Sequence, residues 1–158
     1  MYKKGVWVVY MNSLSKRQKS FFKAAQAVST LSDHRCKIGC IIVNGHRIIS
    51  SGHNSNTKCH SLQAELDEAY FKVSSTGKIH AETSAILPLL KSKVDLSRAT
   101  LYTFRQLHDG RLAMARPCPR CMNLIKMVGI TRIRYTTDDG YASEILEYWG
   151  MSYEWCYH

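Results

Sequence analysis

The hydrophobic pattern of the chain changes repeatedly between helical and strand spacing. Apolar side chains recur every three or four residues over residues 13–31, with Ser13 as a plausible N-cap, which predicts an amphipathic helix. A β-rich run at residues 38–43, the turn dipeptide Asn44-Gly45 and a second apolar run at residues 47–52 predict a β-hairpin. The first third of the chain therefore predicts one helix followed by two antiparallel strands.

The remainder of the chain continues this alternation after a polar stretch. Residues 53–78 have weak periodicity and predict an insertion with at most a short helix at residues 62–73. The later predicted elements are a helix that starts near His80, a strand at 100–104, a helix at 118–128 that stops at Gly129, a strand at 132–136, a helix at 142–149 and a strand at 152–157.

Helices that alternate with strands predict an α/β fold, in which helices cover a central sheet. The hairpin makes the first strand pair antiparallel, so we expect a mixed sheet of about five strands. No repeat, low-complexity tract or Pro/Gly-rich linker divides the sequence. The interpretation that follows is one domain over residues 1–158.

Composition narrows the class of protein. The hydrophobic fraction of 45% and the charged fraction of 22% are ordinary for a globular chain. The apolar run at residues 6–11 is far shorter than the ~20 residues that span a bilayer, and no signal-peptide cleavage site follows it. We therefore expect a cytoplasmic protein with no membrane partner. The net charge of +10 indicates a polyanionic or phosphate-bearing partner.

Two short motifs carry the candidate chemistry. One is His80-Ala81-Glu82, the other is Pro117-Cys118-Pro119-Arg120-Cys121, and each lies at the start of a predicted helix. One imidazole and two thiolates match a catalytic Zn²⁺ site, which takes three protein ligands and leaves a fourth position for water. Helix N-termini also favour the thiolate form that a metal requires. His80, Cys118 and Cys121 are the predicted ligands of one zinc ion.

Glu82 is the predicted proton carrier of this site. It follows His80 by two residues, so its carboxylate is expected near the metal without being a ligand. Either motif alone is also compatible with chance, a redox dithiol or half of a structural zinc site. Together and in this order they match the His-x-Glu and Pro-Cys-x-x-Cys signature of zinc-dependent nucleobase deaminases.

The chain resembles the cytidine deaminase superfamily and, within it, most closely the deoxycytidylate (dCMP) deaminase branch. The resemblance spans roughly residues 20–150 and implies a three-layer α/β/α sandwich, a Zn²⁺ cofactor and a homo-oligomer. It also implies that Asn54 contacts the sugar or base and that the Ala81 backbone N–H contacts the pyrimidine carbonyl. The matching segments are residues 38–43, 51–54, 80–82, 85–87, 117–121, 124–126 and 129–130.

Two departures from the family pattern leave the substrate open. Thr83-Ser84 stand where many dCMP deaminases have an Asn, and a loop at residues 105–116 separates the strand from the Cys motif. Arg105, Arg111 and Arg116 in this loop could hold a 5′-phosphate or a strand backbone, because guanidinium groups bind phosphate with two donors. The loop could also be a solvated surface segment.

The expected function is deamination of dCMP to dUMP and ammonia. The net charge and the Arg-rich loop leave open a deaminase of cytosine or adenine in single-stranded DNA or RNA. A non-catalytic, zinc-containing nucleic-acid-binding module is a third hypothesis, which the presence of Glu82 disfavours. A second, structural zinc site is also considered, with candidate ligands Cys36, Cys40, His53, Cys59 and His60.

Overall fold

The computed structural model describes residues 7–146, which form a mixed sheet and four helices. This arrangement confirms the predicted α/β class. The strands are β1 (Trp7–Tyr10), β2 (Ile38–Asn44), β3 (Arg47–His53), β4 (Ala99–Arg105), β5 (Arg132–Thr137) and β6 (Gly140–Ile145). The helices are α1 (Lys16–Ser29), α2 (Ser61–Phe71), α3 (Ala81–Leu90) and α4 (Pro119–Met127).

The sheet has the strand order β1-β6-β5-β4-β2-β3. Neighbours β4 and β5 pair in parallel, and the other neighbouring strands pair antiparallel, so the sheet is mixed as predicted. The middle strands β2 and β4 are buried along nearly their whole length. Burial on both faces explains why the sequence of β2 is a nearly continuous apolar run rather than an alternating one.

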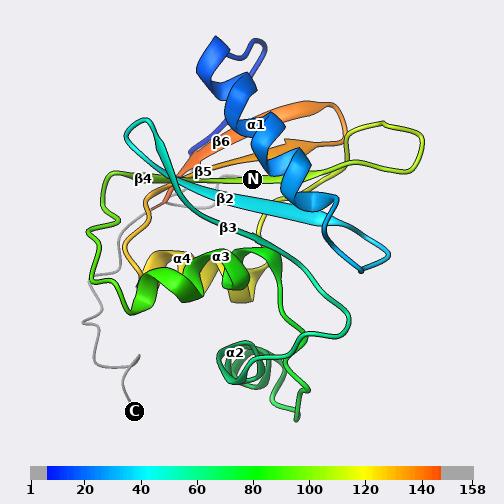
Figure 1. The fold of residues 1–158 in the computed structure, drawn as a ribbon, viewed down its shortest axis with the longest axis vertical. Helices are drawn as coiled ribbons and strands as arrows, with labels where there is room; N and C mark the ends of the chain where they lie inside the picture. The colour runs from blue at the N-terminus through cyan, green and yellow to red at the C-terminus, as the bar shows by residue number, and fades with distance from the viewer. Residues whose placement is uncertain (1–6, 147–158) are drawn as a thin grey trace.

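The three layers are visible in Figure 1, where α1 lies on one face of the sheet and α3 and α4 lie on the other. Helix α2 lies farther from the sheet and contacts α4. Two cores result, one between α1 and the sheet around Phe22 and Tyr102, the other beneath α3 and α4 around Ile86 and Leu124. Full burial of one such side chain contributes about 1.5–3 kcal/mol.

The sheet has six strands where about five were predicted, because both β1 and β6 were missed as strands. The predicted helix at residues 142–149 is wrong over its described part, since Ala142 and Glu144 are buried while Ile145 is exposed, the two-residue period of a strand. A buried glutamate interrupts the apolar alternation by which a strand is recognised. The predicted strand at residues 152–157 lies outside the described residues.

Two smaller predictions are also corrected. Helix α1 begins two residues later than expected, because Ser15 rather than Ser13 is its N-cap and forms a reciprocal capping box with Gln18. In the hairpin Asn44 pairs with Arg47, so the turn residues are Gly45 and His46 instead of Asn44 and Gly45. Gly45 has a φ of 64°, a conformation that favours glycine.

Glycines in the hairpin allow helices to approach closely from both sides. A Cβ atom on Gly39 would lie 2.1 Å from the backbone oxygen of Ala25 in α1. A Cβ atom on Gly52 would lie 2.4 Å from the backbone nitrogen of Ala85 and 2.6 Å from the backbone oxygen of Ala81, both in α3. The missing side chain of Gly52 thus sets the position of the helix that follows His80.

Within residues 53–78 the predicted short helix is present as α2. The His60 side chain caps it by accepting a hydrogen bond from the backbone N–H of Leu62. None of the helices described here combines the length and apolar character that crossing a bilayer requires.

Candidate active site

The candidate site lies at the edge of the sheet where β3 and β4 end. The chain enters α3 through His80 and α4 through Cys118, and each of these residues is the N-cap of its helix with extended backbone angles. Neither side chain caps its own helix. Because the first backbone N–H groups of a helix lack partners within it, both helices direct unpaired donors and a positive dipole end towards this edge.

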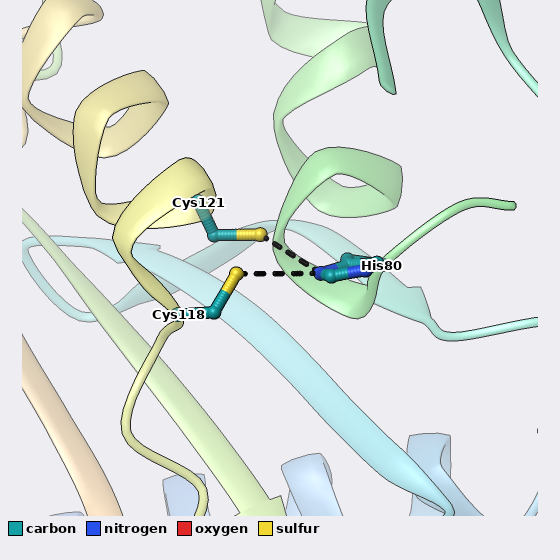
Figure 2. Close-up of side chains that lie close together, drawn as sticks. All are labelled: His80, Cys118 and Cys121. Atoms are coloured by element: carbon teal, nitrogen blue, oxygen red, sulfur yellow. Dashed lines mark hydrogen bonds between the residues drawn. The ribbon is translucent and has the colours of Figure 1, made fainter. Parts of the chain in front are cut away.

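Three side chains from these two helix starts converge (Figure 2). The ligating atoms of His80, Cys118 and Cys121 all lie within 4.8 Å of one another, and no other His/Cys/Asp/Glu group in residues 7–146 meets this criterion for metal binding. The His80 Nδ1 atom lies 3.6 Å from the Cys118 Sγ atom and 3.3 Å from the Cys121 Sγ atom.

These distances fit a zinc ion. A tetrahedral Zn²⁺ with Zn–S of about 2.3 Å and Zn–N of about 2.0–2.1 Å separates its sulfur and nitrogen ligands by about 3.5 Å. The His80–Cys118 and His80–Cys121 separations match that value. One imidazole and two thiols are also a donor set typical of zinc, and three protein ligands would leave one position of a four-coordinate ion for water.

The electrostatics of the site favour a thiolate. A hydrogen bond from the Cys121 thiol, together with a contact to His80, holds the pKa of Cys118 well below its usual range. The same contact with Cys118 raises the pKa of His80. The contact with Cys118 and burial raise the pKa of Cys121, so binding of a divalent cation would displace the protons that Cys121 and His80 retain.

Glu82 lies in the first turn of α3 and is only 5% exposed. Burial raises the pKa of its carboxyl group, while its own backbone N–H and the charge of His80 oppose the shift. A carboxyl group with a raised pKa, beside a metal centre, is suited to accept and return protons near neutral pH.

Asn54 and Ala81 lie at the same edge of the sheet. The Asn54 side chain is buried and holds the segment before β2: its Oδ1 atom accepts hydrogen bonds from Ser32 and Ile38, and its Nδ2 atom donates to Cys36. Ala81 is fully buried as the first residue of α3, so its backbone N–H is one of the donors at the helix start.

The three arginines of the 105–116 loop have separate partners. Arg105 lies at the end of β4, where it contacts the Cys36 sulfur and lines a cavity of about 520 Å³. Arg111 pairs with Asp109 on the exposed tip of the loop. Arg116 forms two hydrogen bonds with Glu144, a carboxylate with 0% exposed side-chain surface.

The candidate ligands of a second zinc site are not brought together in the described residues. Cys40 is buried in β2, and its pKa is raised by burial. His60 uses its Nδ1 atom to cap α2, and Cys36 lies beside Arg105. These residues have local structural roles.

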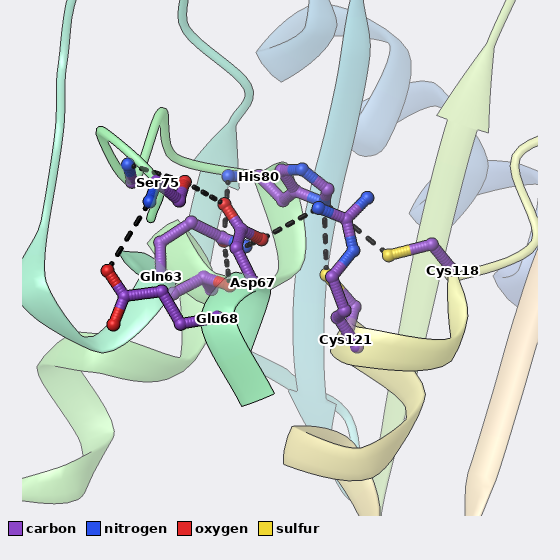
Figure 3. Close-up of polar contacts among 10 residues, drawn as sticks. Gln63, Asp67, Glu68, Ser75, His80, Cys118 and Cys121 are labelled. Atoms are coloured by element: carbon purple, nitrogen blue, oxygen red, sulfur yellow. Dashed lines mark hydrogen bonds and ion pairs between the residues drawn. The ribbon is translucent and has the colours of Figure 1, made fainter. Parts of the chain in front are cut away.

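Three site-adjacent residues were not anticipated: Gln63, Asp67 and Arg120. They connect α2 with the starts of α3 and α4 (Figure 3). Arg120 stands inside the Cys motif, and Gln63 and Asp67 are four residues apart on one helix face, which is the only sequence signal for them. Their pairing depends on how α2 packs against α4.

A metal-binding triad with a buried glutamate at two helix N-termini is the arrangement of a metal-dependent hydrolytic enzyme. The sequence profile described as "Cytidine and deoxycytidylate deaminase zinc-binding region" matches residues 15–137. The deoxycytidylate deaminase of Mycobacterium phage D29 is 32% identical over 127 residues, covering 73% of this chain and 90% of that protein.

Solved structures share the fold. The dCMP deaminase from cyanophage S-TIM5, in complex with dCMP and dUMP, superimposes with a TM-score of 0.55 at 21% identity over 78% of this chain and 83% of that one. Cytidine deaminase from Burkholderia pseudomallei gives a TM-score of 0.55 at 15% identity over 81% and 91%. The chain belongs to the cytidine and deoxycytidylate deaminase zinc-binding family. It is a zinc-dependent deaminase, which confirms the predicted enzyme class and cofactor.

Proposed function

We propose that this enzyme deaminates dCMP to dUMP and ammonia. The observation that carries the proposal is the His80, Cys118 and Cys121 cluster with Glu82 beside it, in a chain that aligns with 90% of a phage deoxycytidylate deaminase. In this proposal the cluster holds zinc and Glu82 is the catalytic acid and base.

The roles of the side chains follow from their positions. Zinc, when bound, supplies the Lewis acidity that makes water a nucleophile near neutral pH. Glu82 accepts a proton from the attacking water and delivers it to the pyrimidine ring, and a further proton transfer releases the 4-amino group as ammonia. In this proposal the backbone N–H of Ala81, the first residue of α3, donates to the pyrimidine carbonyl. Burial of Glu82 strengthens these electrostatic interactions.

Asn54 and the loop arginines are the proposed substrate-binding residues. Arg105 is the strongest candidate for a phosphate contact, since its cavity is also lined by Arg35, Lys37 and His108, and the described lining includes no carboxylate. Arg111 and Arg116 are already paired with carboxylates, which lowers their capacity for a second anion. Asn54 would act on the substrate through the loop that it holds.

The remaining proposals concern the cellular location, the oligomeric state and the alternative substrate. A free nucleotide as substrate is consistent with a cytoplasmic enzyme, and we propose one domain that assembles as a homo-oligomer. A second candidate function is deamination in single-stranded DNA or RNA, which the net charge of +10 favours. The similarity to deoxycytidylate deaminase favours the mononucleotide.

The test is a substrate panel with the zinc-loaded protein. dCMP, dCTP, cytidine and a single-stranded oligonucleotide are incubated separately, and ammonia and the deaminated base are quantified. We expect turnover of dCMP well above that of the other three. Turnover of the oligonucleotide alone would overturn the proposal, and the Glu82→Gln protein provides the background rate.

A further inference from the structure

Helix α2 is linked to both helices of the metal cluster by three polar side chains. These are Gln63 and Asp67 on α2 and Arg120 in the first turn of α4 (Figure 3). Gln63 and Asp67 are buried, with 0% and 7% of their surface exposed. The Arg120 side chain is 18% exposed. Buried polar groups of this kind must be paired, so their partners determine what the group does.

Gln63 is connected to the start of α3. Its Oε1 atom accepts hydrogen bonds from the backbone N–H of His80, at 3.2 Å, and from the Thr83 hydroxyl, at 2.7 Å. Because a backbone N–H can only donate, the amide oxygen of Gln63 must face His80 and its NH₂ group must face away. That NH₂ group donates to the Asp67 Oδ1 atom at 2.9 Å.

Asp67 passes the connection to the start of α4. Its Oδ1 atom accepts a hydrogen bond from Arg120 at 2.7 Å, and its Oδ2 atom accepts one from the Ser75 hydroxyl at 2.7 Å. Despite burial, these hydrogen bonds and the charge of Arg120 lower the pKa of Asp67 and favour its ionised form. The Arg120 guanidinium stacks over the Phe71 ring at 4.7 Å, which fixes its orientation further.

His80 and Cys118 are on different helices, 38 residues apart. The apolar core attaches each helix to the sheet. Apolar contacts are non-directional, so small displacements of a helix along the sheet cost little free energy. Hydrogen bonds between fixed donors and acceptors are directional. A chain of such bonds from His80 through Gln63 and Asp67 to Arg120 therefore determines how the two helix starts lie relative to each other.

We propose that Gln63, Asp67 and Arg120 form a positioning brace that holds the starts of α3 and α4 in the geometry required for zinc. The inference rests on the proposed metal centre and deepens it. It assigns a role to residues 53–78: α2 bonds the backbone N–H of the ligand His80 and the side chain of Arg120, the neighbour of the ligand Cys121. Outer partners of this kind typically affect metal affinity or activity by about 10–100-fold.

The experiment compares Asp67→Asn, Arg120→Gln and the double variant with the wild-type protein. Zinc affinity is measured by competition with a chelator, and the ligand geometry is read from the electronic spectrum of the cobalt(II)-substituted protein. We expect each single variant to weaken zinc binding by about 10–100-fold and to shift the cobalt bands. We expect the double variant to bind zinc about as weakly as the single variant with the lower zinc affinity, because both changes break the same link.

Two further variants serve as comparisons. Glu65→Gln removes an exposed carboxylate from the same helix and is expected to leave zinc affinity and the cobalt spectrum unchanged. Arg120→Lys keeps a positive charge beside Asp67 and is expected to recover part of the loss caused by Arg120→Gln. Equal loss in both Arg120 variants would contradict this expectation and would show that a positive charge alone does not replace the contacts with Asp67 and Phe71.

The proposed brace would be overturned if Asp67→Asn and Arg120→Gln fold and have the same zinc affinity and cobalt spectrum as the wild-type protein. Folding of each apo-protein is followed by circular dichroism, and if Asp67→Asn does not fold, the Arg120 variants decide by the same two readouts. Wild-type dCMP turnover is measured in parallel. A wild-type protein that binds zinc without acting on dCMP contradicts the proposed substrate, while the metal readouts still decide the brace.

Discussion

Single side chains determine the chemistry of this site, and Glu82 is the most sensitive of them. Replacing Glu82 by Gln keeps the shape of the side chain but removes the proton acceptor. We expect zinc content and fold to be retained and turnover to fall by at least roughly 10²–10⁴-fold. Steady-state rates and zinc content by atomic absorption check this, and near wild-type turnover with bound zinc would assign the proton transfer to another group.

The two cysteines have a different expected phenotype from Glu82. Replacing Cys118 or Cys121 by Ala removes one of three protein ligands, so we expect loss of zinc together with loss of activity. Because zinc binds the folded state, the variants should also lose the zinc-dependent rise in melting temperature that the wild type shows. Full zinc occupancy in either variant would contradict the proposed ligand set.

At the level of helices and strands, the close contact between β3 and α3 is testable at Gly52. An added Cβ atom would lie 2.4 Å from the backbone of α3, so Gly52→Ala must displace the helix that carries the metal site at its start. We expect a loss of about 1–3 kcal/mol in the free energy of unfolding and weaker zinc binding. Urea unfolding and chelator competition measure both, with Ser51→Ala as the neighbouring exposed control.

The pair between Arg116 and Glu144 joins the loop before α4 to strand β6. Arg116→Ala leaves the Glu144 carboxylate buried with only the Tyr135 hydroxyl as its remaining side-chain partner among those described. We expect the free energy of unfolding to fall by about 3 kcal/mol, because the buried carboxylate loses its counter-charge. Unfolding measurements should show much of the loss restored by Arg116→Ala combined with Glu144→Gln, and an additive loss would contradict this explanation.

At the scale of the whole molecule, we expect the net positive charge to affect substrate binding mainly through one local contact, between Arg105 and the phosphate of dCMP. Arg105→Ala should raise the KM for dCMP with little change in kcat and leave cytidine kinetics unchanged, because cytidine carries no phosphate. Arg47→Ala, which removes an exposed arginine of β3 outside this loop, is the matched control. Equal, modest effects of Arg105, Arg111 and Arg116 on oligonucleotide affinity, each with a shallower salt dependence, would instead indicate a strand as substrate.

The sequence by itself was sufficient for the chemistry and for most elements. His80, Glu82, Cys118 and Cys121 stand at fixed short spacings at two helix starts, so local geometry already orients their side chains. The α/β class, the hairpin and the alternating helices and strands follow from hydrophobic period in the same way. These features depend on interactions among residues that are close in the chain, so the order of the residues is enough to predict them.

Tertiary structure decided the features that depend on distant pairing. Strand β6 has a buried glutamate, which the Arg116 guanidinium and the Tyr135 hydroxyl partner from other segments, so the sequence suggested a helix there. The sequence presents the loop arginines as one cluster, but Arg116 pairs with the distant Glu144, and Arg111 pairs within the loop with Asp109. Gln63 and Asp67 acquire their partners only when α2 packs beside α4, because a polar side chain reveals its role through a neighbour that the fold supplies.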